Sequence, residues 1–223
     1  MWAARQMFVE HGYDGVRMAA LAKRVGMSEG SIYSYFSTKS DLMQAIVIDF
    51  WREIADGARA SVSSDDPPFQ QLCDLAEYHL ATVIKHFDFL DLTVTLRRGA
   101  DDNIVSREQL RAYTSVFDDI FRKAVDCGEI SPDVVMWLVR DTFFGTLEYS
   151  ARSILGRRTQ STSDMTLVID NLLEQIQKSY GLNTNGAVSA SSLEERITTR
   201  LESVADRLEG AMTQLARDSN LES

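Results

Sequence analysis

The chain has 223 residues and a formal net charge of −10, with 44% hydrophobic and 25% charged residues. This composition is that of an average globular protein, and the sequence contains no run of about 20 apolar residues, the length that a membrane span needs. Only 12 glycines and 3 prolines predict few turns and long helices. Two cysteines exclude a disulfide framework. We expect a protein of the reducing cytoplasm that has no membrane partner.

The negative charge is unevenly distributed along the chain. Residues 1–50 hold five basic and five acidic side chains, so the whole deficit lies beyond them. A neutral amino-terminal segment can contact DNA, because distant charges are screened beyond a Debye length of about 8 Å at physiological salt. We expect such binding to weaken at high salt.

Helix signals begin at the amino terminus. Residues 2–11 are predicted to form a helix that ends at Gly12, and residues 18–25 a second helix that ends at Gly26. Ser28 then provides the N-cap of a third helix. Short helices separated by such a brief turn are typical of a helix-turn-helix unit.

Longer helices follow. Thr38, with Asp41 three residues later, approximates a capping box for a fourth helix that extends to about Ala60. Pro67 or Pro68 is expected in the first turn of the fifth helix, where a missing N–H is harmless. The cap, proline and acid of Ser131-Pro132-Asp133 predict the start of the eighth helix. The remaining predicted helices cover about 68–86, 88–98, 106–126, 131–155 and 163–180.

The third helix has an unusual outward face. Its inward side consists of Ile32 and Phe36, and its outward side consists of Glu29, Gly30, Ser31, Tyr33, Ser34 and Tyr35. Paired tyrosines, hydroxyls and a glycine suit the DNA major groove, which admits one helix. Thr38 and Lys39, at the start of the next helix, can supply N–H groups and a cation to a phosphate.

Three segments resemble the amino-terminal helix-turn-helix of TetR-family transcriptional regulators. They are residues 8–14 (FVEHGYD), 21–36 (LAKRVGMSEGSIYSYF) and 39–42 (KSDL). The resemblance implies an all-α homodimer that binds double-stranded DNA at a palindromic operator. It also implies that a small hydrophobic effector binds the carboxy-terminal body.

On this resemblance the chain divides into four parts. Residues 1–45 form the DNA-binding domain, and residues 46–181 form the ligand-binding and dimerisation domain. Residues 182–192 are a flexible linker by composition, and residues 193–217 form an additional helix with a short heptad pattern. The family's first helix normally starts earlier with a basic arm, so we expect the native amino terminus to be longer.

The resemblance also assigns contacts to DNA. Base edges are assigned to Glu29, Gly30, Tyr33 and Ser34, and phosphates to Ser28, Ser31, Tyr35, Thr38 and Lys39. Arg17 stands where the family usually has a Ser or Thr cap, so it is predicted to contact phosphate instead. A helix-turn-helix shape also occurs without DNA binding, and Tyr33 or Tyr35 would then pack against the first helix.

The body is rich in large apolar residues that either form its core or line an effector pocket. They are Phe50, Trp51, Phe87, Phe89, Tyr113, Phe117, Phe121, Trp137, Phe143, Phe144 and Tyr149. Residues 87–150 resemble, more weakly, the fatty-acid-responsive branch of the family, which implies an acyl-CoA effector. The ligand contacts predicted on this reading are Arg97, Arg98, Tyr113, Phe117, Phe121, Phe143, Phe144 and Leu147. The alternatives are an ordinary core and a solvated arginine pair.

The family implies that the eighth and ninth helices pair with their twofold mates. Apolar positions consistent with that interface, or with core packing, are Val134, Leu138, Leu147, Leu167, Leu172 and Ile176. A rival interpretation is a DNA-independent dimeric sensor or scaffold, and a second rival is a small-molecule enzyme that uses the same apolar cavity.

Other reactive side chains carry less information. His79 and His86 lie about 10.5 Å apart along one helix, too far to share a metal ion, so each is expected to be a partly buried histidine. Cys73 and Cys127 lack CxxC spacing, which leaves a redox sensor as the minor alternative. No catalytic arrangement can be identified. We therefore expect no enzyme activity, no cofactor and no metal.

Overall fold

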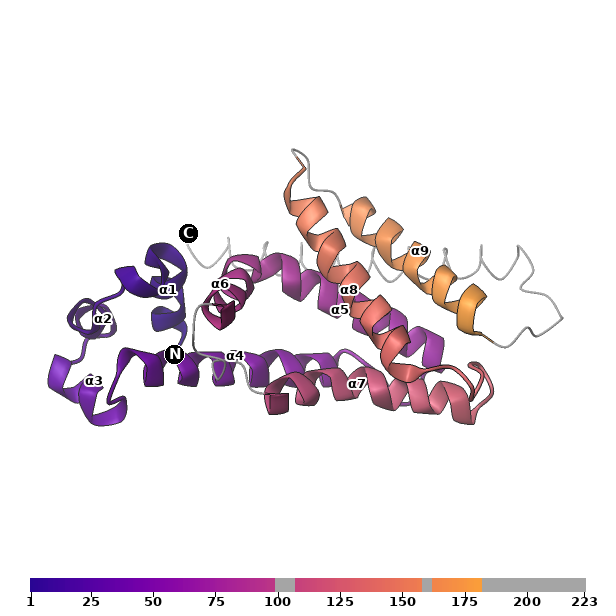
Figure 1. The fold of residues 1–223 in the computed structure, drawn as a ribbon, viewed down its shortest axis with the longest axis horizontal. Helices are drawn as coiled ribbons and strands as arrows, with labels where there is room; N and C mark the ends of the chain where they lie inside the picture. The colour runs from indigo at the N-terminus through magenta and orange to yellow at the C-terminus, as the bar shows by residue number, and fades with distance from the viewer. Residues whose placement is uncertain (99–106, 158–161, 182–223) are drawn as a thin grey trace, which may run out of the picture. The chain divides into compact units, whose positions relative to one another are not determined.

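Nine α-helices make up most of the chain that this computed structural model describes, which is residues 1–98, 107–157 and 162–181. They are α1 (Trp2–Gly15), α2 (Met18–Val25), α3 (Glu29–Tyr35), α4 (Lys39–Ala60), α5 (Pro68–Lys85), α6 (Phe87–Arg98), α7 (Arg107–Asp126), α8 (Met136–Leu155) and α9 (Thr162–Tyr180). Within the described ranges, the only β pairing is one isolated bridge between Ile130 and Gly181. The predicted all-α class is confirmed (Figure 1).

Caps fix the limits of the first three helices. Gly12 has a φ of 69° and interrupts α1, so the predicted stop is real even though a short helical turn continues to Gly15. Gly26 ends α2 in the left-handed conformation with a φ of 71°, which glycine adopts without steric cost. The Ser28 hydroxyl accepts the Ser31 N–H at 3.0 Å and caps α3 as predicted.

The predicted capping box at the start of α4 is also confirmed. The Thr38 hydroxyl accepts the Asp41 N–H, and the Asp41 carboxylate accepts the Thr38 N–H, each at 3.0 Å. Pro68 occupies the first position of α5, as expected from its fixed φ and missing donor.

The predicted start of the eighth helix at Ser131 is wrong. The Ser131 hydroxyl accepts the Asp133 N–H at 3.4 Å within a turn, and the Ser131 N–H donates to the carbonyl of Tyr180 at the end of α9. The cap-like residues are thus used to join this turn to α9. The helix begins only at Met136, after Val135, which makes no side-chain capping bond.

Helix pairing joins the amino-terminal helices to the body. α4 packs on α7, α5 packs on α7, α8 and α9, and α1 packs on α6. Figure 1 shows α4 beside α7, and α8 beside α9. One hydrophobic cluster runs through these contacts, and its fully buried rings include Phe8, Phe50, Phe117 and Phe143. The core therefore extends from α1 to α9.

Some predictions lie outside the described residues. These are the linker at 182–192 and the heptad-patterned helix at 193–217. The predicted boundary between residues 45 and 46 stays a prediction. No helix in the described ranges combines the length and the hydropathy that crossing a lipid bilayer requires.

Candidate nucleic-acid interface and effector site

Helices α2 and α3 form a helix-turn-helix whose turn is held by backbone bonds. The Met27 N–H donates to the Ala22 carbonyl at 2.9 Å across Gly26. Ile32 is only 4% exposed and packs in the core with Leu21. These contacts orient α3, because they bury one side of a seven-residue helix and leave the other side outward.

The outward side of α3 carries the residues that were predicted to meet base edges. Tyr33 and Tyr35 are 46% and 74% exposed, so neither packs into the core. The exposed residues of this recognition face are Glu29, Gly30, Tyr33, Ser34 and Tyr35. The face thus offers phenol and hydroxyl groups on a helix that the core holds from behind. It has the chemistry to read a DNA groove.

The serine hydroxyls of α3 are held by local hydrogen bonds. Ser28 Oγ and Ser31 Oγ lie 2.7 Å apart, and the Ser34 hydroxyl donates to the Ser31 carbonyl at 2.7 Å. A hydroxyl oxygen has two acceptor lone pairs, so these groups can accept further hydrogen bonds. Their fixed positions would reduce the entropy lost on binding.

Lys39 has a structural role that the sequence did not indicate. Its Nζ donates to the carbonyls of Tyr13 and Val16, at 2.9 and 3.3 Å, and the side chain is half-buried. An ammonium group has three donors, so two are used within the protein. The phosphate contact of Lys39 stays a prediction, which the third donor and the N-terminus of α4 could serve.

Positive charge near the recognition face is modest. Arg17 is exposed just before α2, where it makes no side-chain cap, as the departure from the family pattern implied. Arg24 instead forms a two-pronged ion pair with Glu10, at 2.7 and 3.1 Å. Hydrogen bonding to Arg24 holds the pKa of the Glu10 carboxyl below its usual value. Arg24 therefore stabilises the α1–α2 contact, and the phosphate contact of Arg17 stays a prediction.

Six of the eight predicted effector contacts are buried together. Tyr113, Phe117 and Phe121 come from α7, and Phe143, Phe144 and Leu147 come from α8. Phe117 lies 5.1 Å from Phe143 and 5.9 Å from Phe144 between ring centroids. The side chains of Arg97 and Arg98, at the end of α6, lie outside the described part of the chain. Ligand binding by these eight residues stays a prediction.

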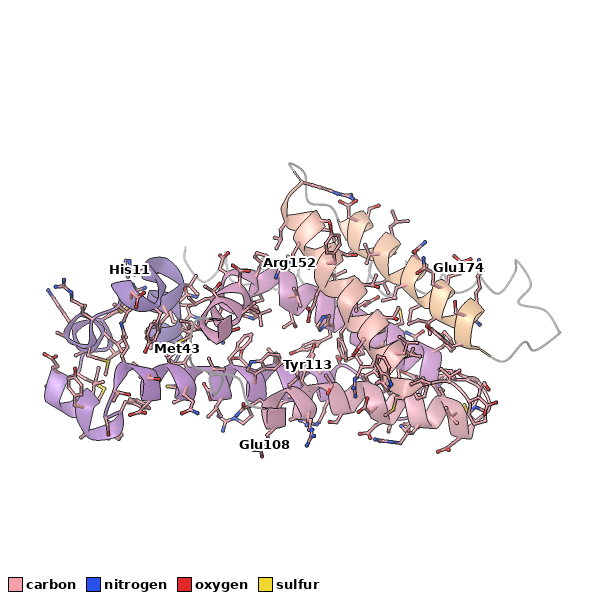
Figure 2. The ribbon with its side chains drawn as sticks, viewed as in Figure 1. His11, Met43, Glu108, Tyr113, Arg152 and Glu174 are labelled. Carbon is pink, nitrogen blue, oxygen red and sulfur yellow. The ribbon has the colours of Figure 1, made fainter. Side chains whose placement is uncertain are left out.

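Two further side chains belong to this group. His79 on α5 is 4% exposed, and its Nδ1 lies 2.7 Å from the Tyr113 hydroxyl. Its ring centroid is 4.9 Å from that of Phe144, and the Trp51 ring is 5.9 Å from that of Tyr113. Figure 2 shows Tyr113 on α7, facing the helices that supply these partners. The aromatic cluster is defined as Trp51, His79, Tyr113, Phe117, Phe143 and Phe144.

Burial changes the proton affinity of the polar members. Desolvation lowers the pKa of His79 to about 3, so its imidazole is neutral near pH 7. Desolvation also raises the pKa of Tyr113, which stays a protonated phenol.

Nε1 of Trp51 and Nε2 of His79 are buried without a hydrogen-bond partner among the described residues. Such groups cost about 1–3 kcal/mol each. The sequence had no local signal for them, because their partners come from distant helices.

A shallow pocket of about 210 Å³ lies between α4 and α5, close to the aromatic cluster. It is lined by Glu53, Ile54, Tyr78, Ala81, Thr82, Lys85 and His86. The Tyr78 hydroxyl donates to the Ile54 carbonyl at 3.1 Å at its wall. Ile54 and Thr82 lie one helical turn beyond Trp51 and His79 on their respective helices.

A bridge of contacts connects this region to α1. Arg5 pairs with Glu53 of α4 at 3.1 Å, and its guanidinium carbon lies 5.2 Å from the Phe50 ring centroid. The same guanidinium lies 5.9 Å from the Phe89 ring of α6. The Arg5 side chain is only 11% exposed, whereas the side chain of its partner Glu53 is 61% exposed. A movement of α4 or α6 would therefore change the position of α1, which carries Arg5.

The residues predicted at a dimer interface separate into two groups. Leu147, Leu172 and Ile176 are at most 1% exposed in their own chain, so core packing, one of the two alternatives for these positions, accounts for them. Leu138 and Leu167 are 45% and 68% exposed. Val134 is half-buried against the core.

Two of the large aromatic residues for which the sequence offered a core or a pocket position are exposed on α8. Trp137 is 56% and Tyr149 is 75% exposed. No described helix of the same chain covers them. Together with Leu138 and Leu167 they form an exposed apolar face on α8 and α9.

Residues 1–46 match the family model of bacterial regulatory proteins, tetR family. The chain is 22% identical over 148 residues to the fatty acid metabolism regulator protein of Bacillus subtilis, covering 66% of this chain and 76% of that protein. It is 25% identical over 179 residues to the HTH-type transcriptional repressor AcnR of Corynebacterium glutamicum, covering 77% of this chain and 89% of the repressor. These relatives are named as regulators rather than enzymes.

Two solved structures show the same fold. The transcriptional regulator FadR from Bacillus subtilis, in complex with stearoyl-CoA, has a TM-score of 0.63 at 20% identity and covers 79% of this chain and 95% of its own. A bacterial regulatory protein in the tetR family from Rhodococcus RHA1 has a TM-score of 0.61 at 18% identity, with coverages of 81% and 94%. The fold likeness therefore extends through the body as well as the first 46 residues.

Proposed function

By its amino-terminal helix-turn-helix the chain belongs to the TetR family of bacterial transcriptional regulators, and from this membership we propose that it is an effector-controlled repressor. A homodimer would bind a palindromic operator through two recognition faces about 34–36 Å apart, one DNA turn. Binding of a hydrophobic effector would favour a different spacing and lower operator affinity. Such a repressor works in the cytoplasm, where its operator DNA is.

The exposed pair Tyr33 and Tyr35 is the observation that carries DNA binding. Both project from α3 while Ile32 anchors the helix in the core, so exposure of the tyrosines is a consequence of the helix-turn-helix packing. Glu29, Gly30, Tyr33 and Ser34 are proposed at base edges. The proposed phosphate contacts are Arg17, Ser28, Ser31, Tyr35, Thr38 and Lys39.

Dimerisation is proposed through the exposed apolar face of α8 and α9. Trp137, Leu138, Tyr149 and Leu167 are each at least 45% exposed, and large aromatic side chains are common anchors of protein interfaces. Pairing this face with its twofold copy would bury it and hold both recognition faces in one assembly.

The aromatic cluster is proposed as the site of the hydrophobic part of the effector. Its residues come from α4, α5, α7 and α8, so a ligand there would contact four helices at once. A long-chain acyl-CoA is the proposed effector, supported by the resemblance to FadR of Bacillus subtilis, whose structure holds stearoyl-CoA. Arg97 and Arg98 are proposed to meet the CoA phosphates, a contact that suits the guanidinium group.

The contacts of Arg5 offer a route from effector to DNA. They join α1 to α4 and α6, so a ligand that displaces either helix would alter the position of the amino-terminal helices. To reduce operator affinity a hundredfold, the effector must prefer the non-binding state by about 2.7 kcal/mol.

Selection of bound genomic fragments tests the regulator proposal. A dimeric repressor should enrich a palindrome, whereas a DNA-independent sensor or scaffold would enrich none. Calorimetry with a long-chain acyl-CoA, followed by operator binding in its presence, tests the effector. Absence of binding, or unchanged operator affinity, would refute the acyl-CoA proposal and leave the regulator proposal intact.

A further inference from the structure

The aromatic cluster contains two polar groups that the protein does not satisfy. Nε1 of Trp51, on α4, and Nε2 of His79, on α5, are buried without a hydrogen-bond partner among the described residues. Both rings contact Tyr113, at 5.9 and 5.8 Å between centroids. Proteins satisfy nearly all of their buried polar groups, so two such atoms around one ring indicate that another molecule completes this site.

The hydrogen bond to Tyr113 indicates which proton His79 carries. The Tyr113 hydroxyl and His79 Nδ1 are 2.7 Å apart. If the hydroxyl donates to Nδ1, the imidazole proton lies on Nε2 and only that N–H lacks a partner. The other tautomer would leave both Nε2 and the phenol proton unsatisfied. The first tautomer is favoured, and Trp51 and His79 then present one N–H donor each.

Two donors require an acceptor, and the surroundings favour an uncharged one. His79 is neutral because burial lowers its pKa to about 3. The nearby Glu148 carboxylate acts on Tyr113 in the same sense as burial, raising the pKa of the phenol. A ligand carboxylate would therefore lose its hydration and gain no described cation in the cluster. A carbonyl oxygen accepts two hydrogen bonds without carrying a charge.

The site is next to an opening. The pocket between α4 and α5 is lined by Ile54 and Thr82, one helical turn beyond Trp51 and His79.

We propose that the N–H groups of Trp51 and His79 bind the neutral carbonyl oxygen of an ester or thioester whose aliphatic chain lies among the phenylalanines of the aromatic cluster. This inference rests on the proposed function, because it takes the effector to be hydrophobic. It adds the polar group by which that effector is recognised.

The indole proton of Trp51 reports the contact directly. In protein labelled with ¹⁵N-tryptophan, the Trp51 indole signal is identified by its loss in Trp51→Phe, since the chain also contains Trp2 and Trp137. The probes are lauroyl-CoA, methyl laurate and S-dodecyl-CoA, which lacks the carbonyl. We expect a downfield shift of the Trp51 signal with a carbonyl probe and none with S-dodecyl-CoA. A shift with lauroyl-CoA alone identifies a thioester source, and a shift with both carbonyl probes identifies the carbonyl itself.

Affinity provides the second measurement. We expect Trp51→Phe to weaken binding of the carbonyl probe about tenfold, or about 1.4 kcal/mol, and to leave S-dodecyl-CoA unaffected. Trp2→Phe, at a position of α1 that is 66% exposed, is the matched control and should change neither affinity. His79→Phe should act like Trp51→Phe, with circular dichroism to confirm folding, since it also removes the partner of Tyr113.

Several outcomes overturn the inference. These are an equal Trp51 shift with S-dodecyl-CoA, no shift with either carbonyl probe, or an unchanged affinity in Trp51→Phe. Buried water would then be the hydrogen-bond partner of the Trp51 and His79 N–H groups. Operator selection by the unliganded protein distinguishes this failure from failure of the proposed function, because a palindrome would still be enriched if only the carbonyl contact is wrong.

Discussion

The Lys39 ammonium lies 2.9 Å from the Tyr13 carbonyl oxygen and 4.4 Å from the centroid of the Tyr13 ring. It therefore attaches the first turn of α4 to the last turn of α1. This turn follows Gly12, whose backbone conformation interrupts the helix. A side chain that is predicted to contact a DNA phosphate thus also holds α1 and α4 together.

Replacing Lys39 by Met should destabilise the protein even without DNA. Hydrogen bonds from a charged donor contribute about 1.5–3 kcal/mol, and both carbonyls would lose theirs. We expect urea unfolding to show a loss of about 2 kcal/mol. Lys23→Met, at an exposed position of α2, is the control and should change stability by less than about 0.5 kcal/mol. Equal stability of the two variants would contradict the role assigned to Lys39.

Tyr33→Ala and Arg17→Ala should weaken DNA binding in different ways. Tyr33 is proposed at a base edge, so its loss should cost about 1–3 kcal/mol on the operator and little on random DNA. Arg17 is proposed at a phosphate, so its loss should weaken binding to all sequences and reduce the salt slope by about 0.9. Titrations at several salt concentrations measure both effects. Similar losses on operator and random DNA for Tyr33→Ala would argue against base contact.

Trp137→Glu should convert the dimer to monomers. A charge placed in an apolar interface loses its hydration, and an aromatic anchor is worth about 2 kcal/mol or more, so the dimer dissociation constant should rise at least about 30-fold. Sedimentation equilibrium measures it. Val94→Glu provides a matched control, because Val94 is 41% exposed on α6. If the Trp137 variant stays dimeric, the interface lies elsewhere.

Stability should fall as the pH is lowered through the range in which unfolded histidine gains its proton. The pKa of His79 is lowered from 6.5 to about 3 in the folded state, so between these values the unfolded chain binds the extra proton. Protonation of His79 in the unfolded chain does not reduce the free energy of unfolding above pH 6.5. Below that value the free energy of unfolding falls progressively toward pH 3, by about 1.4 kcal/mol per pH unit.

The measurement is urea unfolding at intervals between pH 7 and pH 5, above the range in which most carboxylates titrate. His79→Gln should remove most of this slope. Burial also lowers the pKa of His86, so His86→Gln is the comparison and should remove a smaller part. An unchanged slope in His79→Gln would show that the imidazole is not buried in its neutral form.

Arg5→Met should reduce communication between the effector site and DNA. The variant keeps the length of the side chain but loses the pair with Glu53 and the cation–ring contacts to Phe50 and Phe89. We expect effector binding to persist while its effect on operator affinity falls several-fold. Arg52→Met, which loses only an exposed pair with Asp49, should respond as the unsubstituted protein does. Equal responses of the two variants would remove Arg5 from the coupling route.

Local signals identified most of the helices. Ser28 and Ser31, or Thr38 and Asp41, are three residues apart, so their capping bonds form within one turn and depend little on the rest of the chain. The same holds for Gly26, whose left-handed conformation ends α2. The prediction at Ser131 was wrong because the chain forms a turn there, in which the Ser131 carbonyl accepts the Val134 N–H, and the Ser131 N–H joins this turn to the Tyr180 carbonyl, which is close only after α9 has packed.

Amino-acid order was thus sufficient for helix content, for the caps at Ser28 and Thr38 and for the outward position of Tyr33 and Tyr35, because these depend on helical periodicity and on neighbours within one turn. Folding of distant segments against one another was needed to separate buried Leu147 and Leu172 from exposed Leu138 and Leu167. It was also needed to bring Trp51 and His79 to Tyr113. Periodicity shows that a helix has an apolar face, but which helix covers that face is determined by packing between residues far apart in the chain.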